Sequence, residues 1–186
     1  MKTPPSERLF VALELPGEAR RSISAWSVRA LPDELRLVKE EQLHVTLAFL
    51  GWQPAGSAGR VAELVRAAVA GCSAVPLVPA GLRGIPESRP RLLALDLEDP
   101  DGACEALQGA VEQALAAAGV FEPESHPFWV HVTLARVRRG RGAPPLPEPP
   151  PAPPETFVAS QAVLFRSTLR PEGAAYEPLE RFELGS

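Results

Sequence analysis

The chain has 186 residues, of which 45% are apolar and 23% are charged, a balance typical of one folded globular domain. Its net charge of −4 argues against broad binding along a nucleic-acid backbone, although one phosphate could still bind at a local cluster. No stretch approaches the roughly 20 apolar residues that span a bilayer, and the N-terminal residues do not resemble a signal peptide. The two cysteines, Cys72 and Cys104, have no metal-ligand spacing, so we expect reduced thiols and a cytoplasmic protein.

The first half of the chain alternates strand and helix patterns. Apolar residues recur at helical spacing in two segments, and short apolar runs with β-branched or aromatic residues predict strands between them. In chain order we expect a strand at 8–15, a helix at 17–30, a strand at 43–50, a helix at 58–70 and a strand at 74–82.

The second half repeats this order. A strand is expected at 90–97, a helix at 102–118, a strand at 130–137 and a last strand at 157–169. Asp101 stands where an N-cap of the helix would lie, and Gly119 where the helix would stop.

Two pairs of phrases suggest an internal duplication. "RLFVALEL" at 8–15 resembles "PRLLALDL" at 90–97, at an offset of about 83 positions, and His-Val-Thr-Leu occurs twice at an offset of 131 − 44 = 87. Similar offsets for both pairs indicate two copies of one unit. We therefore predict a single domain over 1–186, built as two pseudo-symmetric lobes.

The segment 141–155 is rich in proline, "RGAPPLPEPPPAPPE". Proline cannot enter the interior of a sheet, so we expect an extended surface loop that connects to the last strand. A docking ligand for a partner protein is the alternative interpretation.

The repeated His-Val-Thr-Leu motif carries the chemistry. Because side chains on a strand alternate between faces, His44 and Thr46 share one face, as His131 and Thr133 do. By the same alternation Phe49 belongs to the opposite, packing face. Two such strands from duplicated halves would direct two imidazoles and two hydroxyls into one cleft.

This set of groups suits the hydrolysis of a phosphoester. Imidazole gains and loses a proton near neutral pH, and displacement at phosphorus needs a base on the attacking side and an acid on the leaving side. Each proton transfer contributes roughly 10²–10⁴-fold in rate. Threonine hydroxyls can donate hydrogen bonds to the phosphate oxygens, where charge accumulates.

A metal site and a structural role for each histidine are the alternatives. Zinc catalysis usually needs three protein ligands, and His126 could supply the third nitrogen only at an unusual spacing before His131. No carboxylate lies in either motif. We therefore predict no metal and no cofactor, and place His126 on a loop before the strand.

The paired motifs resemble those of the two-histidine (2H) phosphoesterase superfamily. "RLFVALELP", "LHVTLAFLGW", "PFWVHVTLARV" and "LFRSTLRPEGAAYEPLERFEL" together resemble the RNA 2′,3′-cyclic phosphodiesterases, also described as 2′-5′ RNA ligases. The resemblance implies a bilobal α+β fold, with antiparallel sheets and outer helices around a central cleft. It also implies metal-independent hydrolysis of a terminal 2′,3′-cyclic phosphate to a 2′-phosphomonoester.

The resemblance further implies individual roles. His44 would be the general acid for the leaving 3′-oxygen and His131 the base that activates water, while Thr46, Thr133 and Arg136 would hold the phosphate. Of the aromatic residues beside the second motif, Trp129 or Phe128 could stack a base.

Two departures from the family pattern concern access for a long RNA rather than the chemistry. Val130 stands where many relatives have proline, and the proline-rich loop is unusually long. Two other functions stay open: an RNA-end-binding module without turnover, and the joining of tRNA halves through a 2′-5′ bond. The expected partners are RNA ends or nucleotides with a cyclic phosphate, with no membrane and no obligate protein partner.

Overall fold

The computed structural model describes residues 6–123, 126–138, 140–146, 154–171 and 173–185. Three α-helices, one 3₁₀ helix and nine strands are assigned within these ranges. In chain order they are β1 (Ser6–Glu14), α1 (Gly17–Ala30), β2 (Arg36–Leu37), η1 (Glu40–Gln42), β3 (His44–Pro54), α2 (Ala58–Val69), β4 (Val75–Ile85), β5 (Leu92–Glu98), α3 (Ala103–Ala117), β6 (His131–Arg136), β7 (Phe157–Ala159), β8 (Gln161–Arg170) and β9 (Gly173–Glu183).

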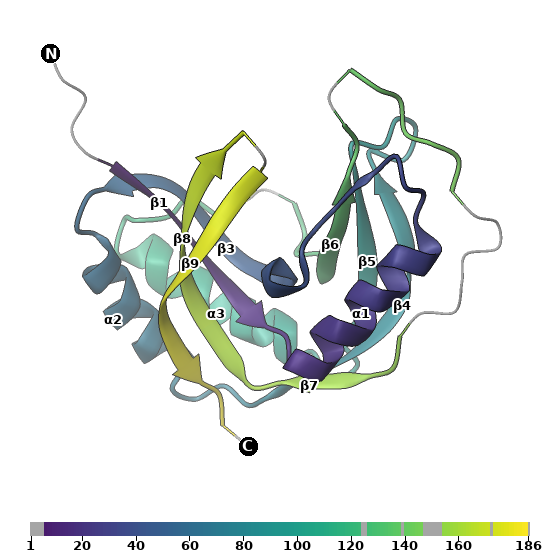
Figure 1. Ribbon diagram of the computed structural model, residues 1–186. Coiled ribbons are helices and arrows are strands. Elements are labelled where there is room, and N and C mark those ends of the chain that lie inside the picture. The colour runs from purple at the N-terminus through teal and green to yellow at the C-terminus, as the bar shows by residue number, and fades with distance from the viewer. Residues whose placement is uncertain (1–5, 124–125, 139, 147–153, 172, 186) are drawn as a thin grey trace, which may run out of the picture.

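The strands form two antiparallel sheets that face each other as two lobes (Figure 1). The first sheet has the order β3-β1-β8-β9, and the second has the order β2-β6-β5-β4-β7. Each motif strand pairs with the strand that opens its half, β3 with β1 and β6 with β5. This arrangement confirms the predicted α+β class with two related lobes.

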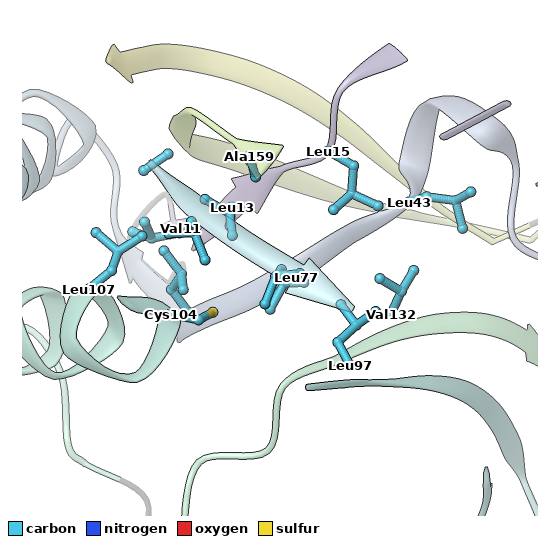
Figure 2. Close-up of a cluster of buried hydrophobic side chains, with 14 of the residues drawn as sticks. Val11, Leu13, Leu15, Leu43, Leu77, Leu97, Cys104, Leu107, Val132 and Ala159 are labelled. Atoms are coloured by element: carbon cyan, nitrogen blue, oxygen red, sulfur yellow. The ribbon is translucent and has the colours of Figure 1, made fainter. Parts of the chain in front are cut away.

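One hydrophobic core joins the two lobes. Val11 and Leu13 from β1, Leu77 from β4, Leu107 from α3 and Val132 from β6 belong to the same buried cluster (Figure 2). The apolar stripes predicted for the helices supply this core, since every third or fourth residue of α3 is buried against it. Because the lobes share their core, the edges that carry the motifs are held in a fixed relation.

Three differences from the predicted elements have simple causes. The last strand is split at Ser160, where the chain passes from β7 in the second sheet to β8 in the first. Strand β9 was not predicted because Pro178 and several charged residues interrupt its pattern; it lies at a sheet edge, where proline is tolerated. The short β2 and η1 were also missed, since each is too brief to show a period.

The start of α3 also differs from the prediction. Asp101 does not cap the helix: the N-cap is Gly102, in a left-handed conformation with φ +67°. The Asp99 carboxylate accepts a hydrogen bond from the backbone N–H of Glu105 instead, at 2.9 Å. Gly119 follows the helix at φ +69°, as expected for a residue that ends it.

The proline-rich segment is described only in part. Residues 141–146 and 154–155 carry neither helix nor strand, and 147–153 lie outside the described residues. Within the described ranges, none of the helices has both the length and the apolar content to cross a membrane.

Candidate active site

The two motifs lie on strands that belong to different sheets yet touch each other. His44 opens β3 and His131 opens β6, and these two strands are in contact. Both rings are half-buried. The charge of His131 disfavours a proton on His44 and lowers its pKa, so the two imidazoles lie close enough to interact electrostatically.

The two imidazoles are held in the same way. His44 Nδ1 lies 2.7 Å from the carbonyl oxygen of Gln42, and His131 Nδ1 lies 2.8 Å from that of Trp129. A carbonyl oxygen only accepts, so in both rings Nδ1 carries the proton of this bond. The second nitrogen, Nε2, is left on each ring to take up or release a proton.

His44 stands in an aromatic surrounding. The ring centroids of Phe10, Tyr176 and Phe165 lie 5.1, 5.5 and 6.2 Å from that of His44. The pKa of His44 is lowered to about 4: burial is the largest cause, the charges of His131 and Arg136 add to it, and the hydrogen bond to the carbonyl of Gln42 opposes it. His44 is therefore neutral in the free protein at neutral pH.

His131 has a polar support that His44 lacks. Its ring stacks on Trp129 with 3.8 Å between centroids and 12° between planes, and Trp129 Nε1 donates to Asp96 Oδ1 at 3.0 Å. The pKa of His131 is also lowered by burial, although the hydrogen bond to Trp129 and the negative charge of Asp96 both oppose this shift. A proton is therefore better accommodated on His131 than on His44.

A β-bulge follows the threonine in both motifs and determines which later residue faces the cleft. Thr46 pairs with Ala12 and Ala48 with Val11, so Leu47 is extra in β3. Leu134 is extra in β6 by the same pattern. An extra residue reverses the alternation of faces beyond it. The position three residues after each threonine therefore returns to the face of the histidine.

These equivalent positions are Phe49 in β3 and Arg136 in β6. Arg136 is exposed, and its charge lowers the pKa of His44, so the guanidinium acts on the ring electrostatically. The assignment of Phe49 to packing was wrong: its side chain is 41% exposed, and it lines a cavity together with His131. The bulge at Leu47 is the reason that simple alternation failed.

A cavity of about 430 Å³ opens from the motifs toward α3. Thr46 and His131 line it, and so do His126, Phe128 and Trp129. Trp129 stacks on His131 through one face of its ring and donates a hydrogen bond to Asp96. That Trp129 or Phe128 stacks a base stays a prediction.

Comparisons with known proteins identify the family of the chain. A model of the 2′-5′ RNA ligase superfamily matches residues 15–169. The chain belongs to this superfamily. A Geobacillus stearothermophilus relative named RNA 2′,3′-cyclic phosphodiesterase is 33% identical over 182 residues, which are 94% of this chain and 56% of that protein. This chain therefore spans little more than half of the Geobacillus protein.

Other superfamily members match over their whole length. An Escherichia coli K12 protein, also named RNA 2′,3′-cyclic phosphodiesterase, is 29% identical over 96% of this chain and 97% of its own. The crystal structure of E. coli LigT complexed with 3′-AMP has a TM-score of 0.81 at 27% identity, covering 98% of this chain and 100% of the other. These matches confirm the predicted family and fold class, and the relatives carry the name of the predicted enzyme class.

Some contacts of this candidate site were missed from the sequence. The backbone carbonyls of Gln42 and Trp129, which accept from the two histidines, both stand two residues before their histidine, a spacing that the repeat could have revealed. Glu14 and Asp96, the acidic ends of the two similar first-strand phrases, lie directly opposite His44 and His131. Asp96 raises the pKa of its histidine, whereas Glu14 does not contribute to that of His44. Both carboxylates are bonded to arginine, Asp96 to Arg83 and Glu14 to Arg20 and Arg181.

A metal site was the rival interpretation of the histidines. Within the described ranges, no three His, Cys, Asp or Glu side chains are grouped so that they could hold a metal ion. His126 lines the same cavity as His131 without completing such a group.

Proposed function

We propose that this chain hydrolyses RNA or nucleotide 2′,3′-cyclic phosphate termini to 2′-phosphomonoesters, with His44 and His131 as the acid–base pair. The observation that carries the proposal is the shared mode of holding both rings. Each Nδ1 is committed to a carbonyl oxygen, so that each Nε2 is available for proton transfer. The names of the superfamily relatives supply the substrate class.

The proposed hydrolysis moves one proton onto His131 and one off His44. His131 Nε2 takes a proton from water while the water oxygen attacks phosphorus. The bond from phosphorus to the 3′-oxygen breaks, and His44 Nε2–H gives its proton to that oxygen. Thr46, Thr133 and Arg136 hold the non-bridging oxygens, on which negative charge accumulates in the transition state. The products are a 2′-phosphomonoester and a free 3′-hydroxyl.

The position of the proton in the free site bears on this division of roles. Arg136 and His131 disfavour a charged His44, whereas Asp96 favours a charged His131. For His44 to act as the acid, the anionic phosphate must raise its pKa on binding. Nuclear magnetic resonance titration of both rings, with and without a nucleoside 2′-phosphate, tests this: the His44 signal should shift to a higher pKa in the complex.

The decisive experiment is the regiochemistry of the product. In the presence of EDTA the protein should open a nucleoside 2′,3′-cyclic phosphate and leave the phosphate on the 2′-oxygen. A 3′-phosphate would reject the assignment of the acid to the 3′-oxygen side, and a requirement for metal would reject the mechanism. Tight binding of a cyclic-phosphate end without any product would instead indicate an RNA-end-binding module. Joined product from paired tRNA halves would identify ligation.

A further inference from the structure

The cavity beside the histidines has two chemically different walls. Aromatic side chains form one wall: Phe49, Phe121, Phe128 and Trp129. The other wall comes from α3, which contributes Glu105, Gln108 and Glu112. A cavity lined by both aromatic side chains and hydrogen-bonding groups suits a planar heteroaromatic ring.

The polar wall follows from the helical repeat. Glu105, Gln108 and Glu112 are spaced by three and four residues, so they share one face of α3. Leu107 and Val111 lie on the adjoining face and are buried in the core. The core contacts of α3 therefore fix the direction in which the three polar side chains project.

Gln108 is the key residue of this wall. Its side chain is only 9% exposed, and no hydrogen bond joins it to any other residue in the described part of the chain. Its amide is not among the fully buried polar groups that lack a partner in the described residues, so it reaches the open space of the cavity. An amide that lines a cavity in this state keeps one acceptor and two donors for a group that enters it.

The groups on the polar wall select among nucleobases. The carboxylates of Glu105 and Glu112 only accept hydrogen bonds at neutral pH. Guanine presents adjacent N–H donors on its Watson–Crick edge, and its carbonyl oxygen can accept from the Gln108 amide. Uracil has a single N–H between two carbonyl oxygens, which two carboxylates repel.

We propose that this cavity is the subsite for the base of the nucleotide that carries the cyclic phosphate, with Gln108 as the residue that reads it and guanine preferred over uracil. The proposal rests on the proposed function, because Thr46 and His131 belong both to this cavity and to the phosphate site. The subsite would make the enzyme prefer RNA ends with a particular terminal base, a preference that the histidines and threonines alone do not produce.

The test compares substrates with and without a base. Wild-type protein should hydrolyse guanosine 2′,3′-cyclic phosphate with a kcat/KM at least about tenfold above that of the uridine compound. Gln108→Leu, which keeps the side-chain size, should lower kcat/KM for the guanosine substrate about tenfold or more, mainly through KM. It should leave the uridine compound and the base-free glycerol 1,2-cyclic phosphate unchanged. Gln113→Leu, at an exposed position of the same helix, is the matched control and should change nothing.

The outcomes separate the two proposals. Equal kcat/KM for all four nucleosides, or an equal loss with the base-free substrate in Gln108→Leu, would overturn the base subsite while leaving hydrolysis intact. If no cyclic phosphate is hydrolysed, including the base-free one, the proposed function fails. Calorimetric binding of guanosine and uridine 2′-phosphates to wild type and Gln108→Leu then decides the subsite. Equal affinities in all four combinations would reject it.

Discussion

The two copies of His-Val-Thr-Leu share their backbone and differ in their surroundings. Both have a bulge after the threonine and a carbonyl acceptor two residues before the histidine. His44, however, is enclosed by aromatic rings beside Arg136, whereas His131 is supported by Trp129 and Asp96. The repeated motif thus places the two imidazoles alike, and the residues around them make their affinities for a proton unequal.

Removal of either imidazole tests whether both copies are needed. His44→Ala and His131→Ala should each lower kcat by roughly 10²–10⁴-fold or more, since each removes one proton transfer. If the two histidines act as a unit, kcat of the double variant should be only slightly lower than kcat of the less active single variant. Steady-state hydrolysis of a cyclic nucleotide measures this, and thermal unfolding verifies that the fold is intact. Retention of most activity in either single variant would sink the assignment.

The threonines test whether the two copies hold the phosphate equally. Thr46→Val and Thr133→Val keep the shape of the side chain and remove its hydroxyl. Loss of one hydrogen bond to a developing oxyanion costs roughly 10²–10³-fold in kcat, and we expect both variants to fall in this range. Thr168→Val, at an exposed position of β8, is the matched control. A large loss in one variant only would mean that one lobe binds the phosphate alone.

Arg136 has no cationic counterpart in the other copy, where Phe49 takes its place. Arg136→Met should weaken binding of a nucleoside 2′-phosphate about tenfold, because a charge-assisted hydrogen bond is lost. It should also raise the pKa of His44, since the neighbouring positive charge that lowers it is gone. Calorimetry and ring titration follow the two effects. Arg138→Met, whose guanidinium bonds the Glu34 carbonyl, should change neither.

Substitution of the carboxylates opposite the histidines should have the smallest effect on activity. It tests most directly whether the two imidazoles differ in pKa. Asp96→Asn should lower the pKa of His131, because the charge of Asp96 raises it, and should move the corresponding limb of the pH–rate profile to lower pH by less than about one unit. Glu14→Gln should barely move His44, because no effect of Glu14 contributes to its shift. Equal shifts in the two variants would remove the proposed difference between the lobes.

Much of this architecture was predictable from local patterns. Helix α1 begins and ends at the predicted residues, and α2 and α3 do so within one residue, since their apolar spacing is regular. Phe49 was misplaced because a bulge depends on pairing with a distant strand rather than on its own sequence. Asp96 and Gln108 were missed for a related reason. Asp96 acts on His131 across a strand pair, and Gln108 faces residues of other elements across a cavity. Contacts of this kind do not produce a periodic pattern in the sequence.

The path of the chain between the two sheets determines whether the protein can be divided into two fragments that each contain a complete sheet. The connections β1–β2, β2–β3, β3–β4 and β7–β8 each pass from one sheet to the other, so neither lobe is a single uninterrupted stretch of polypeptide. A break between α2 and β4 would leave β8 and β9 on a different fragment from β1 and β3, the other strands of their sheet. Neither fragment would then contain a complete first sheet, and the intact backbone joins the two sheets at four places.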